Sequence, residues 1–369
     1  MLGKAVVVVL LGLLCYHFLQ VCERFGYFNQ QKIYDHLPGP CRLVPRVENG
    51  SEDAQVTPDG KLFVTSGLAI FNLEDPVFEQ MTGQIFLLDT NEEQPEAVSL
   101  PIKGDFDHDN FRPHGISLWN DPKTGELIVY VVNHFGPYDR VEKFLYDSRN
   151  IALRHLQSIS DPNMILVNDL HVLGADRFYY TNCNGYRSLG MMMAQFLSPV
   201  GFGSVGLYDG SRSSSGASRA LLVDTGLMLP NGINGSPDGK YLYVAIALTG
   251  SMNVYRINKD GSITLHDVIA LHSGLDNIDV VPETGEVFIG SHPSMARAMK
   301  MSQDPMNSMA PSQVLRLKMK DGHATAVEET LSLNGTLLYG SSVAVYVNKR
   351  LYIGTVSHRL MICDVLYMS

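Results

Sequence analysis

Residues 275–292, LDNIDVVPETGEVFIGSH, contain the unit that decides the fold. The polar pair Asp276 and Asn277 precedes a short apolar step, a turn over residues 282–285, and an apolar run that ends at His292. Proline fixes φ and glycine tolerates positive φ, so this segment suits a tight turn, and the apolar run after it suits a pleated strand. The stretch therefore predicts a strand that follows a turn and a polar pair.

The same unit recurs along the chain, roughly every 45 to 65 residues. The six copies begin at Ser51, His114, Asn168, Asn231, Asp276 and Ser341. Repeats of about this period, built from short strands, are typical of β-propellers, in which small antiparallel sheets surround a central channel. The sequence predicts an all-β, six-bladed β-propeller, with insertions between Ser188 and Leu207 and between Ser294 and Pro311.

Composition agrees with one large repetitive domain, predicted over residues 26–369. The chain has 369 residues, of which 45% are hydrophobic and 18% charged, so it can bury a large core. A net charge of −10 disfavours nucleic acid as a partner. The 33 glycines and 18 prolines fall largely in short turns, which favours an all-β protein.

The N-terminus is predicted to be a separate element, residues 1–25. An apolar run over residues 5–21 follows Lys4 and is just long enough to span a bilayer as a helix. Three interpretations remain: a retained signal-anchor, which we favour because no A-x-A cleavage site follows, a cleaved signal peptide, or a buried helix. The positive charge before the run places the body in the lumen or outside the cell.

The cysteines and glycosylation motifs point to the secretory pathway. A bridge between Cys41 and Cys363 would tie the first segment of the body to the last strand and close the ring; the alternative is two free buried thiols. Asn49, Asn234 and Asn334 each begin an N-glycosylation triplet.

Repetition also predicts a metal site, because residues at one register in every blade converge on the propeller axis. Any one polar residue before a turn is more often a capping residue. Five oxygen-bearing side chains in equivalent places, however, suit a hard cation with six to eight oxygen ligands, which favours calcium. These five are Glu52, Asn168, Asn231, Asp276 and Asn277. A second calcium ion is predicted at Asp53, Asp169 and the backbone carbonyl of Ile116.

Two histidines are predicted to act beside the metal, one as a general base and the other as its relay partner. His114 shares the axial register, and His134 ends a strand of the same copy. Imidazole titrates near neutral pH and can take a proton from water, although a lone histidine is more often structural. His292 is a weaker third member, expected near the tunnel mouth as a bystander, and His358 occupies a similar strand end.

Other hydrolase and nucleotide-binding signatures are missing from the sequence. It contains no G-x-S-x-G, H-E-x-x-H, P-loop or paired C-x-x-C motif.

The motifs resemble those of the paraoxonase/arylesterase family. They include RPHGIS at 112–117, VVNH at 131–134, LPNGINGSPDGKYLYVA at 229–245 and LDNIDVVPETGEVFIGSHP at 275–293, and the resemblance covers roughly residues 41–363. It implies a six-bladed propeller with two calcium ions in its tunnel, a Cys41–Cys363 bridge and a retained hydrophobic N-terminus. It also implies the two calcium ligand sets named above, with His114 as the base and His134 as its relay partner.

Four positions depart from the family pattern. Cys183 and Asn184 stand where the family has an Asp-His pair, Ser291 replaces a cysteine found in many members, and Ile70 replaces a tyrosine in the pocket loop. The apolar segment 191–202 is expected to be a lid over the tunnel or core, rather than a membrane-binding helix.

The predicted function is calcium-dependent hydrolysis of lactones and of aryl or carboxylic esters, with membrane attachment through the N-terminus. The alternative is a membrane-anchored, non-catalytic propeller that assists the assembly of a membrane-protein client. The N-terminal segment and the departures at 183 and 184 favour the alternative, whereas the histidine pair favours the enzyme.

Overall fold

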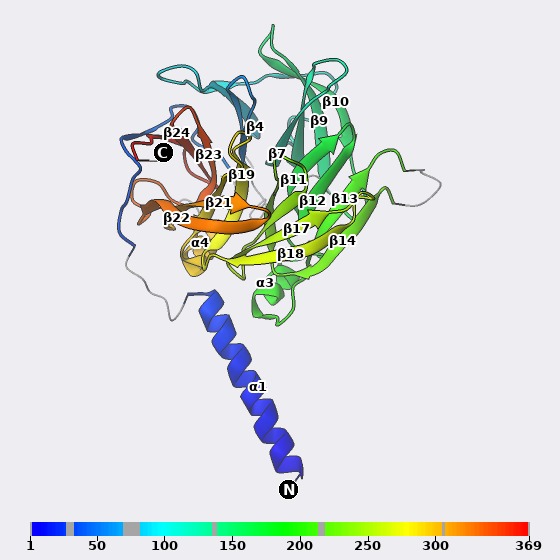
Figure 1. The fold of residues 1–369 in the computed structure, drawn as a ribbon, viewed down its shortest axis with the longest axis vertical. Coiled ribbons are helices and arrows are strands. Elements are labelled where there is room, and N and C mark those ends of the chain that lie inside the picture. Colours follow the sequence, from blue (N-terminus) through cyan, green and yellow to red (C-terminus); the bar gives the residue numbers. More distant parts are fainter. Residues whose placement is uncertain are drawn as a thin grey trace.

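The computed structural model describes residues 2–26, 33–68, 82–134, 139–212, 218–304 and 307–367. Its described strands form six sheets that follow one another around a central axis (Figure 1). Five sheets contain four strands, and the second contains a fifth at its edge. The predicted all-β, six-bladed propeller is confirmed, with one apolar helix at the N-terminus.

Each blade is numbered by the order of its innermost strand in the chain. Blade 1 contains β2 (Ala54–Val56), β3 (Lys61–Ser66), β4 (Gln84–Asp89) and β5 (Val98–Ser99). Blade 2 contains β7 (Pro113–Asn120), β8 (Leu127–Asn133), β9 (Arg140–Asp147) and β10 (Ala152–Ile159), with β6 (Ile102–Lys103) at its edge. Blade 3 contains β11 (Val167–Gly174), β12 (Arg177–Asn182), β13 (Gly203–Asp209) and β14 (Ala220–Leu227).

The remaining blades repeat this order from the axis outward. Blade 4 contains β15 (Pro230–Gly235), β16 (Tyr241–Ile246), β17 (Ser251–Ile257) and β18 (Ile263–Ala270). Blade 5 contains β19 (Gly274–Val280), β20 (Val287–His292), β21 (Ser312–Lys320) and β22 (His323–Leu333). Blade 6 contains β23 (Ser341–Val347), β24 (Arg350–Thr355), β25 (Met361–Asp364) and β1 (Cys41–Leu43).

The hydrophobic core lies between neighbouring blades. One buried cluster joins Leu62 and Phe86 of blade 1 to Val343 and Tyr352 of blade 6, and others join further blades in the same way. Successive side chains of a strand point to opposite faces, so Tyr241 and Tyr243 of β16 pack against blade 5, whereas Leu242 and Val244 pack against blade 3. The innermost strands contact one another around the ring and line the axis with polar residues.

Blade 6 closes the ring with strands from both ends of the propeller. β1 pairs antiparallel with β25, and Cys41 lies opposite Cys363 in that register. The two cysteines form a disulfide across 322 residues of sequence, as predicted. The bridge covalently joins the first and last strands of the propeller, so the sheet that closes the ring cannot open by simple fraying.

The innermost strands are irregular where the axial residues lie. In five of them the pairing register shifts at these positions; in β19 the shift falls between Leu275 and Ile278 and leaves Asp276 and Asn277 outside the regular ladder. A β-bulge of this kind re-aims a side chain relative to the sheet. The bulges therefore explain why polar pairs within strands face the axis.

Two glycines of the innermost strands, Gly115 and Gly232, lie directly against residues of the next blade. A Cβ on Gly115 would lie 2.5 Å from Oδ1 and 2.6 Å from Cα of Asp169, and a Cβ on Gly232 would lie 2.5 Å from Cα of Asn277. Such distances are far shorter than a normal van der Waals contact. Gly115 and Gly232 thus allow the strand of the next blade to approach the axis.

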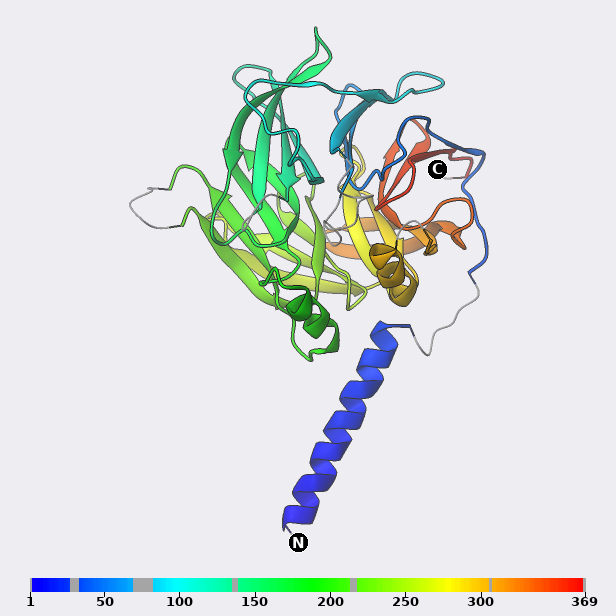
Figure 2. The same ribbon diagram turned by 180° about the vertical axis from the view of Figure 1, so that it is seen from behind.

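Three described helices lie at one end of the propeller (Figures 1 and 2): α1 (Leu2–Arg24), α3 (Leu189–Leu197) and α4 (Met295–Gln303). Helix α1 projects away from the blades. Two of its side chains contact the end of α3. Nε2 of His17 lies 2.7 Å from the carbonyl oxygen of Leu197, and Nη1 of Arg24 donates to the carbonyl of Ser198 at 2.7 Å. The segment Lys4–Arg24 is long and apolar enough to cross a membrane, while its role as a retained signal-anchor stays a prediction.

Candidate functional site

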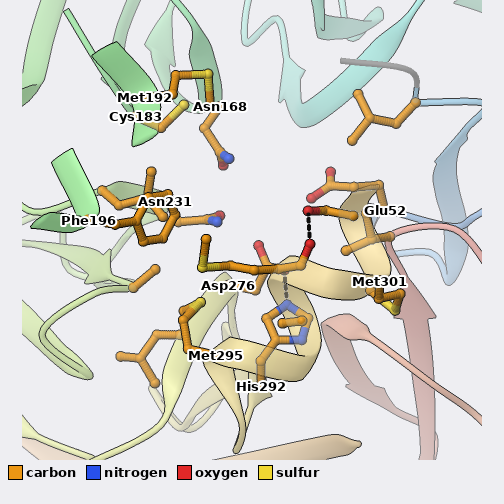
Figure 3. Close-up of a pocket in the computed structure, with 18 of the residues that line it drawn as sticks. Glu52, Asn168, Cys183, Met192, Phe196, Asn231, Asp276, His292, Met295 and Met301 are labelled. Carbon is orange, nitrogen blue, oxygen red and sulfur yellow. Dashed lines mark hydrogen bonds and ion pairs between the residues drawn. The ribbon is translucent and has the colours of Figure 1, made fainter. Parts of the chain in front are cut away.

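The five predicted calcium ligands converge on the axis, where four of them line one cavity of about 290 Å³ (Figure 3). Asn277 is completely buried and donates through Nδ2 to the backbone carbonyl of Glu52 at 3.0 Å and to its Oε1 at 2.8 Å. Four buried side-chain oxygens of this set have no hydrogen-bond partner among the described residues. They are Glu52 Oε2, Asn168 Oδ1, Asn231 Oδ1 and Asn277 Oδ1.

Unpartnered buried oxygens are unusual in native proteins, and several that converge can together bind a cation. Burial, followed by the negative charge of Asp276, raises the pKa of Glu52 well above its usual range. Both effects oppose a bare carboxylate at this position, and a bound cation would relieve them. The donors are carboxylate and amide oxygens, which suit a hard cation and therefore fit calcium.

The chemistry of the donor set also disfavours zinc. Within the described ranges, no three His, Cys, Asp or Glu side chains gather as a metal-binding cluster. The axial set has only two carboxylates, Glu52 and Asp276, and its other members are amides, whereas zinc in proteins takes mainly nitrogen and sulfur ligands.

The second predicted set lies next to the first, along the axis. Asp53 and Asp169 are buried and line a narrow cavity of about 10 Å³ together with Ile116. Oδ2 of Asp53 accepts the backbone N–H of Ile116 at 2.8 Å, and Oδ2 of Asp169 accepts that of Ile233 at 2.8 Å. Burial raises the pKa of both carboxyls, and a neighbouring carboxylate adds to the shift in each case. These two side chains thus join adjacent blades and also concentrate negative charge.

The two predicted histidines are in direct contact. Nδ1 of His114 lies 2.8 Å from Nε2 of His134, and Nε2 of His114 lies 3.3 Å from Oε1 of Glu52. His114 is 3% exposed, and burial lowers its pKa to about 4 against the opposing effect of Asp276. Burial also lowers the pKa of His134 well below its usual value, with His114 and Arg187 adding to the shift. Both imidazoles are therefore neutral at physiological pH, as a general base requires.

The structure adds a carboxylate to this pair that sequence reasoning missed. Oδ1 of Asp139 lies 2.9 Å from Nδ1 of His134, and it also contacts Nη2 of Arg187. Asp139 is fully buried. No repeat position or motif marks Asp139, and its arginine lies 48 residues further along the chain. Only the fold brings Arg187 to Asp139, while His134 lies five residues before it in the sequence.

His292 was expected to be a bystander near the tunnel mouth, and this was wrong. Its Nε2 lies 2.8 Å from Oδ2 of Asp276 (Figure 3). The reason is register: His292 pairs with Gly274 across β19 and β20, only two residues before Asp276. His358, in contrast, stacks on Tyr339 with ring centroids 4.1 Å apart and does not line the axial cavity.

The two predicted insertions form an apolar wall around the cavity. Helix α3 overlaps the apolar segment 191–202 and contributes to one side, and α4 contributes to the other. The apolar residues that these helices place on the cavity are Met192, Met193, Phe196, Met295, Met299 and Met301. An apolar cavity with polar groups at one end is the usual form of a small-molecule site.

The departures at 183 and 184 take structural roles here. Cys183 is buried at the cavity, where burial raises the pKa of its thiol to about 12, so the thiol is neutral. Its backbone carbonyl accepts from Gln195 of α3 at 3.0 Å, and Nδ2 of Asn184 donates to the carbonyl of Met191 at 3.4 Å. Both residues therefore help to hold α3. Ile70 lies outside the described residues.

The predicted glycosylation sites differ in their surroundings. Asn49 is exposed and Asn334 is partly exposed. Asn234 instead lies on the innermost strand β15, where Nδ2 donates to the carbonyl of Ile278 at 3.0 Å and Oδ1 accepts from Gly235 at 2.8 Å. A glycan would be attached to Nδ2 of Asn234, which is occupied by its hydrogen bond to Ile278 in the folded protein. Asn49 and Asn334 therefore remain the better predictions for glycosylation.

Comparison with known proteins agrees with the geometry of the site. The family model for Arylesterase matches residues 36–365. Serum paraoxonase/lactonase 3 of Mus musculus is 32% identical over 369 residues, covering 98% of this chain and 100% of the relative. Serum paraoxonase/arylesterase 2 of Gallus gallus is 33% identical, covering 88% of each chain.

A solved structure shows the same fold at low sequence identity. The luciferin-regenerating enzyme is 8% identical with a TM-score of 0.54, covering 89% of this chain and 96% of its own. The family match over most of the chain and the two relatives lead to one conclusion: this chain belongs to the arylesterase family, whose members are ester hydrolases.

Proposed function

We propose that the chain hydrolyses lactones and aryl or carboxylic esters in its axial cavity, with calcium bound to the axial oxygens and His114 as the general base. The observation that carries this proposal is the chain of two neutral imidazoles, joined at 2.8 Å, that ends beside the unpartnered oxygens. Family membership supports ester hydrolysis in general. The calcium ions and the histidine roles are our inference from the residues.

The first calcium would be held by the axial oxygens of Glu52, Asn168, Asn231, Asp276 and Asn277. A cation bound there supplies positive charge to the substrate carbonyl oxygen and to the oxyanion that develops from it. Asp53, Asp169 and the carbonyl of Ile116 would hold a second ion that joins blades 1, 2 and 3. The second site is away from the apolar wall, so we assign it a structural role.

The histidines handle the proton. His114 accepts a proton from a water molecule as that water attacks the carbonyl carbon, and His134 accepts through the hydrogen bond between the two rings. The same pair then returns a proton to the alkoxide or phenoxide leaving group. Because burial holds the pKa of His114 near 4, the base is unprotonated over the whole neutral range.

The cavity wall determines which substrates fit. The methionines of α3 and α4 offer flexible, polarisable apolar contacts, which suit an acyl chain or an aryl ring. The buried carboxylate, amide and imidazole groups gather at the axial end, while Ser302 and Gln303 of α4 add polar side chains to the wall. A bound ester would therefore place its carbonyl at the axis and its apolar part against the methionines. Apolar lactones and aryl esters fit this division.

The alternative is a membrane-anchored, non-catalytic assembly factor. Its support is the exposed apolar helix α1, which could hold the propeller at a membrane. A membrane-protein client stays a prediction. The neutral, hydrogen-bonded pair His114 and His134 favours the hydrolase, because structural calcium binding alone does not need a base.

The test is turnover by the full-length chain, purified in detergent with calcium. Initial rates are measured on a series of aliphatic lactones and on phenyl acetate, with and without excess chelator, and for Asn231→Ala. We expect chelator-sensitive turnover that Asn231→Ala abolishes. A folded, calcium-loaded protein with no turnover on any of these substrates would favour the assembly factor.

A further inference from the structure

Asp139 connects three parts of the molecule through one buried carboxylate. Its side chain accepts from the ring of His134 at the end of β8, from Arg187 just before α3, and from the backbone N–H of Val167 at the start of β11. The Oδ1 to Nδ1 distance is 2.9 Å for His134, and the Oδ2 to N distance is 2.6 Å for Val167. A buried carboxylate is costly unless it is paired with a cation and hydrogen-bonded, and these three contacts meet that condition.

The carboxylate determines where the protons of the two histidines lie. An ionised carboxylate can only accept, so Nδ1 of His134 carries a proton. A neutral His134 then has a lone pair on Nε2, and this atom accepts Nδ1–H of His114 at 2.8 Å. His114 is left with its own lone pair on Nε2, the nitrogen on the side of Glu52 and the cavity. One acceptor therefore sets the tautomers of both rings.

Arg187 links this arrangement to the cavity wall. It pairs with Asp139, and the next residue, Ser188, is the N-cap of α3, where its hydroxyl accepts the backbone N–H of Met191. Arg187 also neutralises the buried carboxylate, which otherwise would face desolvation without a cation. Val167, the third partner, immediately precedes Asn168 of the axial oxygen set.

We propose that Asp139 is a positioning residue that fixes the tautomers of His134 and His114. Its ion pair with Arg187 couples these tautomers to the position of helix α3. The inference rests on the proposed function for its catalytic consequence. Asp139 does not touch the cavity, so it acts through His134 and not on the substrate. Asp139 is thus a third member of the proton-handling chain, and Arg187 makes the cavity wall part of its support.

The decisive variant is Asp139→Asn in the full-length protein. The buried N–H of Val167 needs an acceptor, so the amide oxygen takes that place and the amide N–H₂ faces His134. Nδ1 of His134 must then accept, its proton moves to Nε2, and His114 loses the lone pair on the cavity side. A wrong tautomer of this type lowers kcat by about 10⁴ in a serine protease.

We expect kcat to fall at least ~100-fold in Asp139→Asn, with KM changed less than about threefold. The matched control is Asp161→Asn, another buried aspartate, whose carboxylate accepts from the backbone N–H of Arg219 and of Ala220 away from the cavity. This control should retain wild-type kcat. Arg187→Lys keeps the ion pair and should retain activity, whereas Arg187→Met should lose roughly tenfold and raise KM for apolar esters.

The direct readout is the tautomer itself, from ¹⁵N chemical shifts of histidine-labelled protein. Wild-type His134 should carry its proton on Nδ1, and Asp139→Asn should move it to Nε2. A wild-type proton on Nε2 would overturn the proposal even if the variant did not fold, as would unchanged kcat with an unchanged tautomer. Because the spectrum needs no substrate, absence of turnover in the wild type would contradict the proposed function and leave this test intact.

Discussion

Asn277 holds Glu52 with both of the hydrogen bonds that its amide nitrogen can donate, at 2.8 Å to Oε1 and at 3.0 Å to the backbone carbonyl. A residue of blade 5 thus fixes the carboxylate that precedes β2 in blade 1. The same contacts orient the amide, because its oxygen must lie opposite the donating nitrogen. Oδ1 of Asn277 has no partner among the residues that the structure describes, and it is therefore available to a cation.

Replacement of this residue should weaken calcium binding more than it changes the fold. In Asn277→Ala the protein loses one candidate ligand and the two hydrogen bonds that orient another. We expect calcium affinity to fall at least ~100-fold, since each buried hydrogen bond is worth about 1 kcal/mol and the ligand adds to this. Isothermal titration calorimetry measures the change, with Asn258→Ala, in the turn between β17 and β18, as the control. Equal affinities in the two variants would contradict the assignment of Asn277.

The histidine pair should affect turnover and leave calcium binding intact. His114→Gln and His134→Gln each keep a polar side chain but lose the base, so we expect kcat to fall by ~10² to 10⁴. The double variant should be little worse than either single one, because the two rings act as a unit. Steady-state kinetics with saturating calcium checks this. Additive losses would indicate that the histidines act independently.

The pH dependence of kcat/KM follows from the burial of His114. Burial lowers the pKa of this group to about 4, and only the neutral imidazole can take a proton. The rate should therefore be constant from about pH 5 to pH 8 and fall on the acid side with a midpoint near pH 4. A pH profile in a buffer series without calcium ligands measures it. A midpoint at the ordinary histidine value near 6.5 would show that the base is exposed or is another residue.

Much of this site could be predicted because it follows the repeat. Glu52, Asn168, Asn231 and Asp276 occupy one register, and a propeller converts a shared register into a shared axis. The contact of His292 with Asp276 could not be predicted from the repeat, because it depends on the pairing of His292 with Gly274 of β19. Asp139 lies only five residues from His134 but occupies no repeat position or motif, and its contact with Arg187 joins segments 48 residues apart that only the tertiary fold brings together.

The bulges of the innermost strands were equally invisible in the sequence, but their packing consequence can be tested. In Gly232→Ala the new Cβ would lie 2.5 Å from Cα of Asn277, so one of the two strands must move. We expect a loss of a few kcal/mol in unfolding free energy and weaker calcium binding. Gly174→Ala is the control, because a Cβ there meets no atom within 4 Å. Chemical denaturation of both variants distinguishes axial packing from a general effect of replacing a strand glycine.

The central claim is that the axial oxygens hold the calcium that hydrolysis requires. The most direct measurement compares two curves for the full-length chain: the rate of phenyl acetate hydrolysis and calcium binding, each as a function of free calcium. The account predicts that the transition in the rate coincides with the transition in binding, and that both are lost in Asp276→Ala. Full turnover at free calcium far below the measured Kd, or undiminished turnover in Asp276→Ala, would contradict it.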